Sequence, residues 1–205
     1  PNTVNGSSLW NPVALALQTN NTLLRQRIMG NYYAEAEFLK HFTFRAEFAF
    51  DASQNKNKSY IPRYSFGVVS NDINQMMQKE DHSWFWMQKD YLTYHQWIKG
   101  HDITAMAGFE AMKSSWEGTQ LIKKNFITDK IFVMGEDGEY VSNYGWKDAA
   151  SNASFFARVN YGYDDRYLLT ATLRADGSSK FGPNNKWGWF PSAAVAWRIS
   201  QETFM

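Results

Sequence analysis

The sequence predicts an all-β fold, an antiparallel up-and-down sheet of about seven strands with long loops at one end. Three observations predict it. Apolar and polar residues alternate with period two in several segments, as in strands with two different faces. Many of these segments reach the roughly 9–11 residues that a tilted membrane-spanning strand needs. Tight turns also alternate with long connections along the chain. Together these features favour a transmembrane β-barrel.

The alternation is clearest between residues 28 and 50. From 28 to 38 the even positions are apolar or small, whereas Glu35 and Glu37 lie at odd positions. From 42 to 50 four even positions are phenylalanine, which a helix would spread around most of its circumference. The same period predicts strands near 102–112, 157–163, 167–175 and 192–199, and a less regular strand over 84–97.

The predicted connections alternate in length. Tight turns are expected at 39–41, 98–101 and 164–166, long loops near 52–83 and 113–153, and a medium loop near 177–187. Compact soluble domains rarely contain structureless connections above about 12–15 residues. The long segments are rich in Asn, Ser, Lys and Gly, so we expect them to be solvated loops. Residues 1–21 are expected to form another loop, with one short helical turn at 12–18.

The composition fits such a barrel. The chain of 205 residues contains nine Trp, eleven Tyr and fifteen Phe, yet its mean hydropathy is −0.52. Soluble cores use mainly Leu, Ile and Val, whereas strands between lipid and a wet interior average out in hydropathy. Aromatic residues flank the tight turns on the apolar phase: Phe38, Phe42, Tyr163 and Tyr167. They predict an aromatic girdle, with ordinary aromatic packing in a sandwich as the alternative.

Several other classes are excluded or disfavoured. The absence of cysteine excludes disulfides and thiolate sites. A net charge of +1 argues against a nucleic-acid partner bound through phosphates. No apolar run approaches the length of a transmembrane helix, and the N-terminus lacks the pattern of a signal peptide.

Alternation alone leaves a soluble β-sandwich open, because its sheets also have one apolar and one polar face. Sandwich strands are usually nearer five or six residues, which favours the barrel. The charges of the clear strands all fall on the polar phase: Glu35, Glu37, Arg45, Glu47, Arg158, Arg174, Asp176 and Arg198.

A series of motifs in the last quarter carries a family resemblance. It comprises Arg158-Val159-Asn160-Tyr161, Asp165-Arg166-Tyr167-Leu168-Leu169-Thr170, Arg174-Ala175-Asp176-Gly177-Ser178-Ser179-Lys180-Phe181-Gly182, Trp189-Phe190-Pro191-Ser192, Ala196-Trp197-Arg198-Ile199-Ser200 and Glu202-Thr203-Phe204-Met205. This ordered series resembles the barrel of SusC/RagA-type TonB-dependent outer-membrane transporters. The strands that contain Gly30-Asn31-Tyr32-Tyr33-Ala34 and Gly108-Phe109-Glu110 are also similar to that family.

The resemblance implies a function. Such transporters import large nutrients, oligosaccharides or peptides, across the bacterial outer membrane. They work with a SusD-like surface lipoprotein that caps the barrel and draw energy from the TonB complex. The family barrel has about 22 strands around a plug. Residues 1–205 are therefore expected to be one part of such a barrel, without the plug domain and the remaining strands.

Two sets of residues are candidates for contacts with other molecules. Trp84, Trp86, Trp116, Trp146 and Tyr64 lie in or beside the predicted loops and are expected to contact substrate or the capping lipoprotein, with local loop packing as the alternative. Arg158, Arg174, Asp176 and Arg198 are expected to face the lumen near one another. A structural ion network is favoured for them over contact with substrate or plug, because interior charges need partners.

No enzyme, cofactor or metal site is predicted. Glu35 and Glu37 have the spacing of an acid–base pair on one face, but two solvated carboxylates are the favoured interpretation. The four histidines, at 41, 82, 95 and 101, lack a metal-ligand spacing. At 136–139 an acidic loop tip is favoured over a calcium site. At 176–179 a strand end that turns into a loop is favoured over a serine nucleophile. A soluble sandwich that binds glycan through exposed Trp and a glycan-cleaving enzyme are the competing hypotheses.

Overall fold

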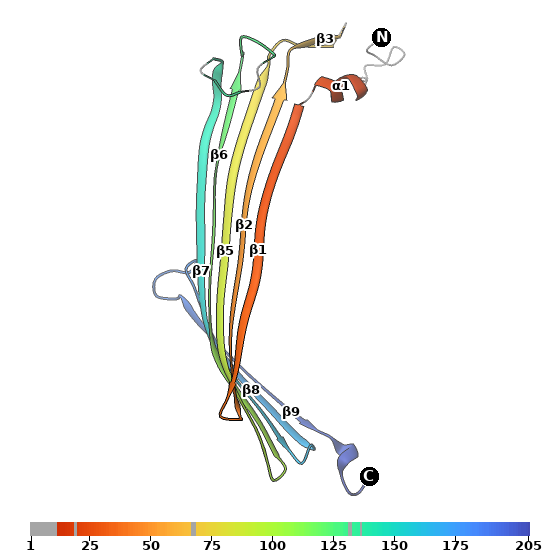
Figure 1. The fold of residues 1–205 in the computed structure, drawn as a ribbon, viewed down its shortest axis with the longest axis vertical. Coiled ribbons are helices and arrows are strands. Elements are labelled where there is room, and N and C mark those ends of the chain that lie inside the picture. Colours follow the sequence, from red (N-terminus) through yellow and green to blue (C-terminus); the bar gives the residue numbers. More distant parts are fainter. Residues whose placement is uncertain (1–11, 19, 67–68, 131–132, 136) are drawn as a thin grey trace. The chain divides into compact units, whose positions relative to one another are not determined.

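The computed structural model describes residues 12–18, 20–66, 69–130, 133–135 and 137–205. Seven long strands form one sheet in the order β1–β2–β5–β6–β7–β8–β9, and β3 pairs with β4 in a small second sheet (Figure 1). The elements are α1 Pro12–Gln18, β1 Asn20–Phe38, β2 Phe42–Ile61, β3 Tyr64–Phe66, β4 Val69–Asn71, β5 Gln75–Ile98, β6 His101–Lys124, β7 Glu139–Tyr163, β8 Tyr167–Ser178, β9 Trp187–Trp197 and the 3-10 helix η1 Ile199–Gln201. The all-β fold, the seven strands and the short helical turn at 12–18 are confirmed.

The three tight turns lie where they were predicted, and each has two residues with positive φ. These pairs are Leu39–Lys40, Lys99–Gly100 and Asp164–Asp165. In the third turn the N–H of Arg166 donates to the carbonyl of Tyr163 at 2.9 Å. Two consecutive left-handed residues give the turn a twist that matches the twist of the flanking strands. Antiparallel neighbours therefore continue in register from the turn, with Tyr163 paired with Tyr167 and Asn152 with Ser178.

The predicted long loops are mostly strand, which corrects the sequence analysis. β2 continues to Ile61 and β5 begins at Gln75, so only 62–74 remain between them, and these include β3 and β4. β6 likewise continues to Lys124 and β7 begins at Glu139. β1 begins at Asn20, inside the segment expected to be loop. These extensions carry polar residues on both faces. Their backbone pairs with neighbouring strands, but the sequence shows no hydrophobic alternation from which these strands could be predicted.

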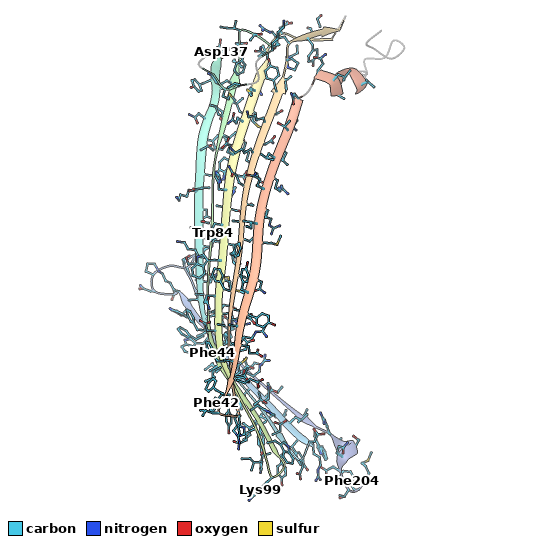
Figure 2. The ribbon with its side chains drawn as sticks, in the orientation of Figure 1. Phe42, Phe44, Trp84, Lys99, Asp137 and Phe204 are labelled. Carbon is cyan, nitrogen blue, oxygen red and sulfur yellow. The ribbon has the colours of Figure 1, made fainter. Side chains whose placement is uncertain are left out.

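Two rows of aromatic rings mark the apolar face in the half of the sheet next to the tight turns. The first row lies at the turns. It contains the ring contacts Phe38–Phe42, Phe42–Tyr94, His101–Tyr163, Tyr163–Tyr167 and Tyr167–Trp197. The second row contains Tyr32–Phe50, Phe50–Trp84, Phe109–Phe155 and Phe155–Trp187. Figure 2 shows Phe42 close to the tight turns and Trp84 farther along the strands.

The predicted girdle is therefore present at the turns, with a second row beyond it. From Tyr163 to Phe155 in β7 the chain advances eight residues between the two rows, and from Trp197 to Trp187 in β9 it advances ten. About ten residues is the length with which a tilted strand crosses a bilayer. Between the rows the apolar face carries aliphatic side chains, as at Val159, Leu169 and Val195, and in β2 it carries Phe44 and Phe48, and these side chains are exposed.

The contacts divide the chain into two compact units, each built from pieces of several strands. The first contains 1–28, 52–83 and 116–148, and the second contains 29–51, 84–115 and 149–205. The first has a small buried core of Tyr60, Met76 and Phe126. The second contains both aromatic rows. Within the described residues, no helix has the length and apolar character to cross a membrane.

Candidate functional site

Arg174 is the centre of an ion cluster on the polar face of the second unit. Its Nε lies 2.6 Å from Oδ1 of Asp176, and its Nη2 lies 3.3 Å from Oε1 of Glu110. The same Nη2 donates to the hydroxyl of Ser154 at 3.0 Å, and Ser154 is buried. Three neighbouring strands, β6, β7 and β8, thus place acceptors around one guanidinium. Planar guanidinium groups suit such convergent sites because they offer several donors in a fixed geometry.

Arg45 forms a second cluster on the polar face of β1, β2 and β5. Its Nε lies 2.7 Å from Glu47, its Nη1 lies 3.4 Å from Glu35, and its guanidinium covers the ring of Tyr33 at 4.2 Å. The hydroxyl of Tyr91 donates to Glu47 at 3.3 Å. Glu35, one of the carboxylates considered as an acid–base pair, is therefore held by an arginine.

Two aromatic rings join the clusters into one polar belt, defined here by Glu35, Arg45, Glu47, Lys89, Tyr91, Glu110, Phe156, Arg174 and Asp176. The ammonium of Lys89 lies 5.4 Å from the ring centre of Tyr91 and 5.8 Å from that of Phe156. Arg174 lies 5.9 Å from the same Phe156 ring. In such contacts the negative face of the ring attracts the cation. The belt therefore runs without a break from β1 to β8.

The four charged residues predicted to lie together are only partly brought together. Arg174 and Asp176 form an ion pair, as the network interpretation expects. Arg158 is exposed and lies opposite Thr172, two positions along β8 from Arg174. Arg198 lies at the tight-turn end, where it forms an ion pair with Asp165. The expectation that Arg198 lies near the other three residues is therefore wrong. Arg198 follows the end of β9, and its partner Asp165 lies in the turn between β7 and β8.

Three aromatic side chains of the first unit form a cluster around Trp146, defined as Trp116, Tyr144 and Trp146. The ring centre of Trp146 lies 5.6 Å from that of Trp116 and 5.7 Å from that of Tyr144. Trp116 and Tyr144 are about half exposed. The ammonium of Lys79 lies over the Trp146 ring at 5.1 Å. This arrangement gives a rigid aromatic surface with a nearby cation, of the type that binds planar or ring-shaped ligands.

Trp146 is fixed by close packing on Gly118. A Cβ added at Gly118 would overlap the Trp146 ring and lie 2.6 Å from the carbonyl oxygen of Glu80. The glycine therefore lets the indole lie flat against the neighbouring strand. The indole N–H of Trp146 is buried and has no acceptor among the described residues, although a buried indole usually finds one.

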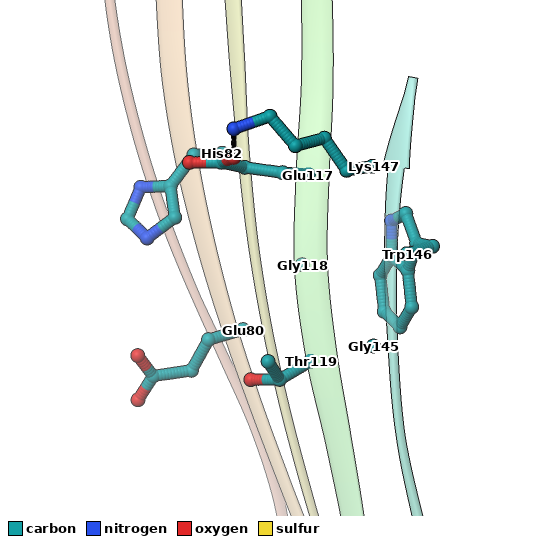
Figure 3. Close-up of a pocket in the computed structure, with 8 residues that line it drawn as sticks. All are labelled: Glu80, His82, Glu117, Gly118, Thr119, Gly145, Trp146 and Lys147. Atoms are coloured by element: carbon teal, nitrogen blue, oxygen red, sulfur yellow. Dashed lines mark ion pairs between the residues drawn. The ribbon is translucent and has the colours of Figure 1, made fainter.

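A hollow lies beside this cluster in the first unit (Figure 3). Its volume is about 490 Å³, and it is lined by Glu80, His82, Glu117, Gly118, Thr119, Gly145, Trp146 and Lys147. Lys147 and Glu117 form an ion pair of 2.8 Å. The hydrogen bond from Lys147 holds the pKa of Glu117 below its usual value, and the same bond raises the pKa of Lys147. Consecutive residues of a strand point to opposite faces, so Lys147 and Trp146 are on different faces of β7.

The five predicted aromatic contacts separate into different places. Trp116 and Trp146 lie in β6 and β7 rather than in loops, and they form the cluster just described. Trp84 lies in β5 and stacks on Phe50 in the second aromatic row. Trp86 lines a hollow on the same apolar phase. Tyr64 lies in the small β3–β4 sheet, paired with Asn71. The expected place in loops is wrong for the four tryptophans, which lie in strands, and strand phase decides which face each ring occupies. Their contact with substrate or lipoprotein stays a prediction.

The first unit also contains a loop anchor that the sequence did not indicate, defined as Tyr60, Arg63, Asn74 and Asp129. Asp129 accepts hydrogen bonds from the Tyr60 hydroxyl at 2.7 Å, from Asn74 at 2.8 Å and from Arg63 Nε at 2.9 Å. Burial would raise the pKa of Asp129, but these hydrogen bonds outweigh it and hold that pKa well below its usual range. Burial, together with the bond to Asp129, raises the pKa of Tyr60 to about 12.

The segment that follows β6 is fastened at two more points. Asn74, with no exposed surface, binds both backbone groups of Phe126. Lys123, only 1% exposed, donates to the carbonyl of Gly135 at 2.7 Å and lies over the ring of Tyr140. Among the described residues, no three His, Asp or Glu side chains form a metal-binding group. Glu136, part of the acidic tip considered for calcium, lies outside the described residues.

Motifs from three separate segments meet at the tight-turn end of the second unit. The carboxylate of Glu202 accepts hydrogen bonds from Tyr167 at 2.7 Å, Trp197 at 2.9 Å and Arg166 at 3.2 Å. These donors, first Tyr167 and then Trp197, lower the pKa of Glu202. The motifs recognised in the last quarter of the sequence therefore form one contact that fastens the segment after β9 to the sheet.

The chain is similar to known transporters and receptors. Residues 2–204 match the family described as "TonB dependent receptor-like, beta-barrel". The chain is 31% identical over 214 residues to TonB-dependent receptor P26 of Formosa agariphila, and the match covers 98% of this chain and 21% of that protein. It is 27% identical over 208 residues to TonB-dependent receptor SusC of Bacteroides thetaiotaomicron, covering 99% of this chain and 20% of SusC.

A solved structure shows the same fold. The structure of the RagAB peptide transporter superimposes with a TM-score of 0.87 at 22% identity, covering 99% of this chain and 23% of that one. The chain thus spans about a fifth of the length of the relatives it matches. With its alternating strands and its match over residues 2–204, the chain belongs to the TonB-dependent receptor β-barrel family.

Proposed function

We propose that this chain forms part of the wall of an outer-membrane transporter of the SusC/RagA type, which imports a large nutrient, an oligosaccharide or a peptide. The observation that carries the proposal is the pair of aromatic rows, eight to ten residues apart along β7 and β9, in a chain that belongs to this receptor family. Rings at both interfaces with an exposed apolar band between them are the surface that a bilayer covers. The polar belt then faces the lumen.

The further components follow from the family. A SusD-like lipoprotein caps the barrel, and the TonB complex supplies energy through a plug that belongs to the rest of the protein. The relatives support this, because one is SusC and the superimposed structure is the RagAB peptide transporter. The Trp146 cluster, which carries half-exposed rings beyond the second aromatic row along β6 and β7, is the proposed contact for substrate or for the capping lipoprotein.

The test uses the intact parent protein in its own cell. The proposal expects the protein in the outer-membrane fraction, extraction only with detergent, co-purification with a lipoprotein, and loss of uptake of its nutrient when the TonB complex is disabled. A parent protein that remains monomeric in buffer without detergent would exclude a membrane barrel and favour the soluble sandwich. Uptake that persists without the TonB complex would contradict only the part of the proposal in which TonB supplies the energy.

A further inference from the structure

A second hollow lies in the second unit, and Trp86, Lys113, Ser151, Gly177 and Trp187 of its lining are on the phase that carries the apolar face. Its volume is about 370 Å³, and its lining includes Trp86, Lys113, Gly177, Lys186 and Trp187. Trp187 also stacks with Phe155 in the second aromatic row. A Cβ added at Gly177 would lie 2.9 Å from the Trp187 ring, so the glycine lets the indole cover the strand and shape one wall.

The hollow lies at one particular height on the sheet. Tyr167 pairs with Trp197 beside the tight turn, and Gly177 pairs with Trp187 ten residues farther along β8. His101, where β6 begins after its turn, is likewise ten residues from Ala111, which also lines the hollow. Because about ten tilted residues cross the hydrocarbon layer, the hollow lies where lipid headgroups begin.

The charge in the hollow has one sign. The lining contains two lysines and neither aspartate nor glutamate, and its other polar members are Ser151, Asn152, Ser178 and Ser179. Lys113 and Lys186 are exposed, and no carboxylate forms an ion pair with either of them in the part of the chain that the structure describes. Asp176, the neighbouring acid, is held by Arg174 on the opposite face.

We infer that this hollow binds the phosphorylated headgroup of an outer-leaflet lipid. The ammonium groups of Lys113 and Lys186, the latter reaching from the segment before β9, pair with the phosphate. The hydroxyls of Ser151 and Ser179 donate to its oxygens, and the indoles of Trp86 and Trp187 lie at the boundary between acyl chains and headgroups. Basic pockets at this depth recognise anionic headgroups, and tryptophan is enriched at the same interface. The inference rests on the proposed outer-membrane location.

The test compares two double variants of the intact parent protein in detergent. Lys113→Gln with Lys186→Gln removes both cations of the hollow. Lys40→Gln with Lys99→Gln removes two exposed cations at the opposite, tight-turn end and is the matched control. Native mass spectrometry then measures the binding of lipid A, with dephosphorylated lipid A and inorganic phosphate as further probes. Heat-dependent mobility in SDS gels confirms that each barrel is folded.

We expect at least a tenfold loss of lipid A affinity for the first variant and none for the control. Equal binding by the first variant, or equal binding of dephosphorylated lipid A, would overturn the inference. Displacement of lipid A by millimolar inorganic phosphate would assign the hollow to free anions instead. Nutrient uptake is expected to persist in the first variant, so loss of lipid binding is separable from failure of the proposed transport function. A parent protein that is absent from the outer membrane refutes that function.

Discussion

Asn74 holds Phe126 by both of its backbone polar groups. Its Oδ1 accepts from the N–H of Phe126 at 2.7 Å, and its Nδ2 donates to the carbonyl of Phe126 at 3.1 Å. The completely buried Asn74 side chain therefore supplies the two hydrogen bonds that a neighbouring strand would otherwise make with Phe126, which lies after the end of β6. This contact, with Asp129, organises the residues that follow β6.

Removal of this contact should loosen the segment from 125 to 130. Asn74→Ala leaves two buried backbone groups without partners, which costs about 1–3 kcal/mol in local opening. Hydrogen exchange of the intact protein should show faster exchange at Phe126, while the strands near the tight turns keep their protection. Asn143→Ala, at an exposed position of β7, is the control and should change neither. Unchanged protection in the Asn74 variant would contradict the anchoring role.

The loop anchor should be resistant to mild acid. The pKa of Asp129 is lowered in the folded chain, so its stabilising effect is complete above the unfolded pKa, near 3.8, and declines as pH falls below that value. Limited proteolysis of the segment after β6 should therefore be equal at pH 7 and pH 5 and should increase only in stronger acid. The Asp129→Asn variant should be cleaved readily at pH 7, at pH 5 and in stronger acid, because it lacks the carboxylate that accepts the bonds from Arg63 and Tyr60. Cleavage that rises between pH 7 and pH 5 would contradict this assignment.

Arg174 should contribute more to barrel stability than Arg158, which lies two positions away across the strand pair. Arg174→Ala leaves Glu110, Asp176 and buried Ser154 without their shared donor, whereas Arg158→Ala removes an exposed side chain. Since Arg174 is partly exposed, the expected loss is on the order of 1 kcal/mol. The measurement is the temperature at which the folded band disappears in SDS gels. Equal losses for the two variants would show that the belt contributes no specific stability.

Substrate or lipoprotein binding should depend on the Trp146 cluster and not on Trp84. Trp116→Ala and Trp146→Ala are expected to weaken binding about 2–10-fold. This range corresponds to the loss of one aromatic pair, which contributes about 0.5–1.5 kcal/mol. Gly118→Ala should act in the same direction, because its methyl group would displace the Trp146 ring. Trp84→Ala removes a ring of the second aromatic row and should leave affinity unchanged. Isothermal titration of the purified complex measures each effect, and loss with Trp84→Ala alone would reverse the assignment.

The sequence predicts the part of the fold that alternation controls. The strands between the aromatic rows, the three tight turns and the ion pair of Arg174 with Asp176 could be predicted, because one apolar face and one polar face impose a period of two. The strand extensions at 52–61 and 113–124 could not be predicted, since polar residues on both faces leave no alternation of apolar and polar positions. The loop anchor could not either, because Asn74 and Asp129 are 55 residues apart and only the paired strands bring them together.

The interval between the aromatic rows limits how strands of this sheet can change in length. Insertion of one residue between the rows reverses the phase of every residue beyond it and brings polar side chains to the apolar face. Insertion of two residues in one strand keeps the phase but moves its ring out of the row shared with its neighbours. Changes in strand length are therefore tolerated best in the segments that follow the second row in sequence, where both faces are polar and phase has little consequence. The proposed contact around Trp146 belongs to such segments, so it can change while the aromatic rows keep their spacing.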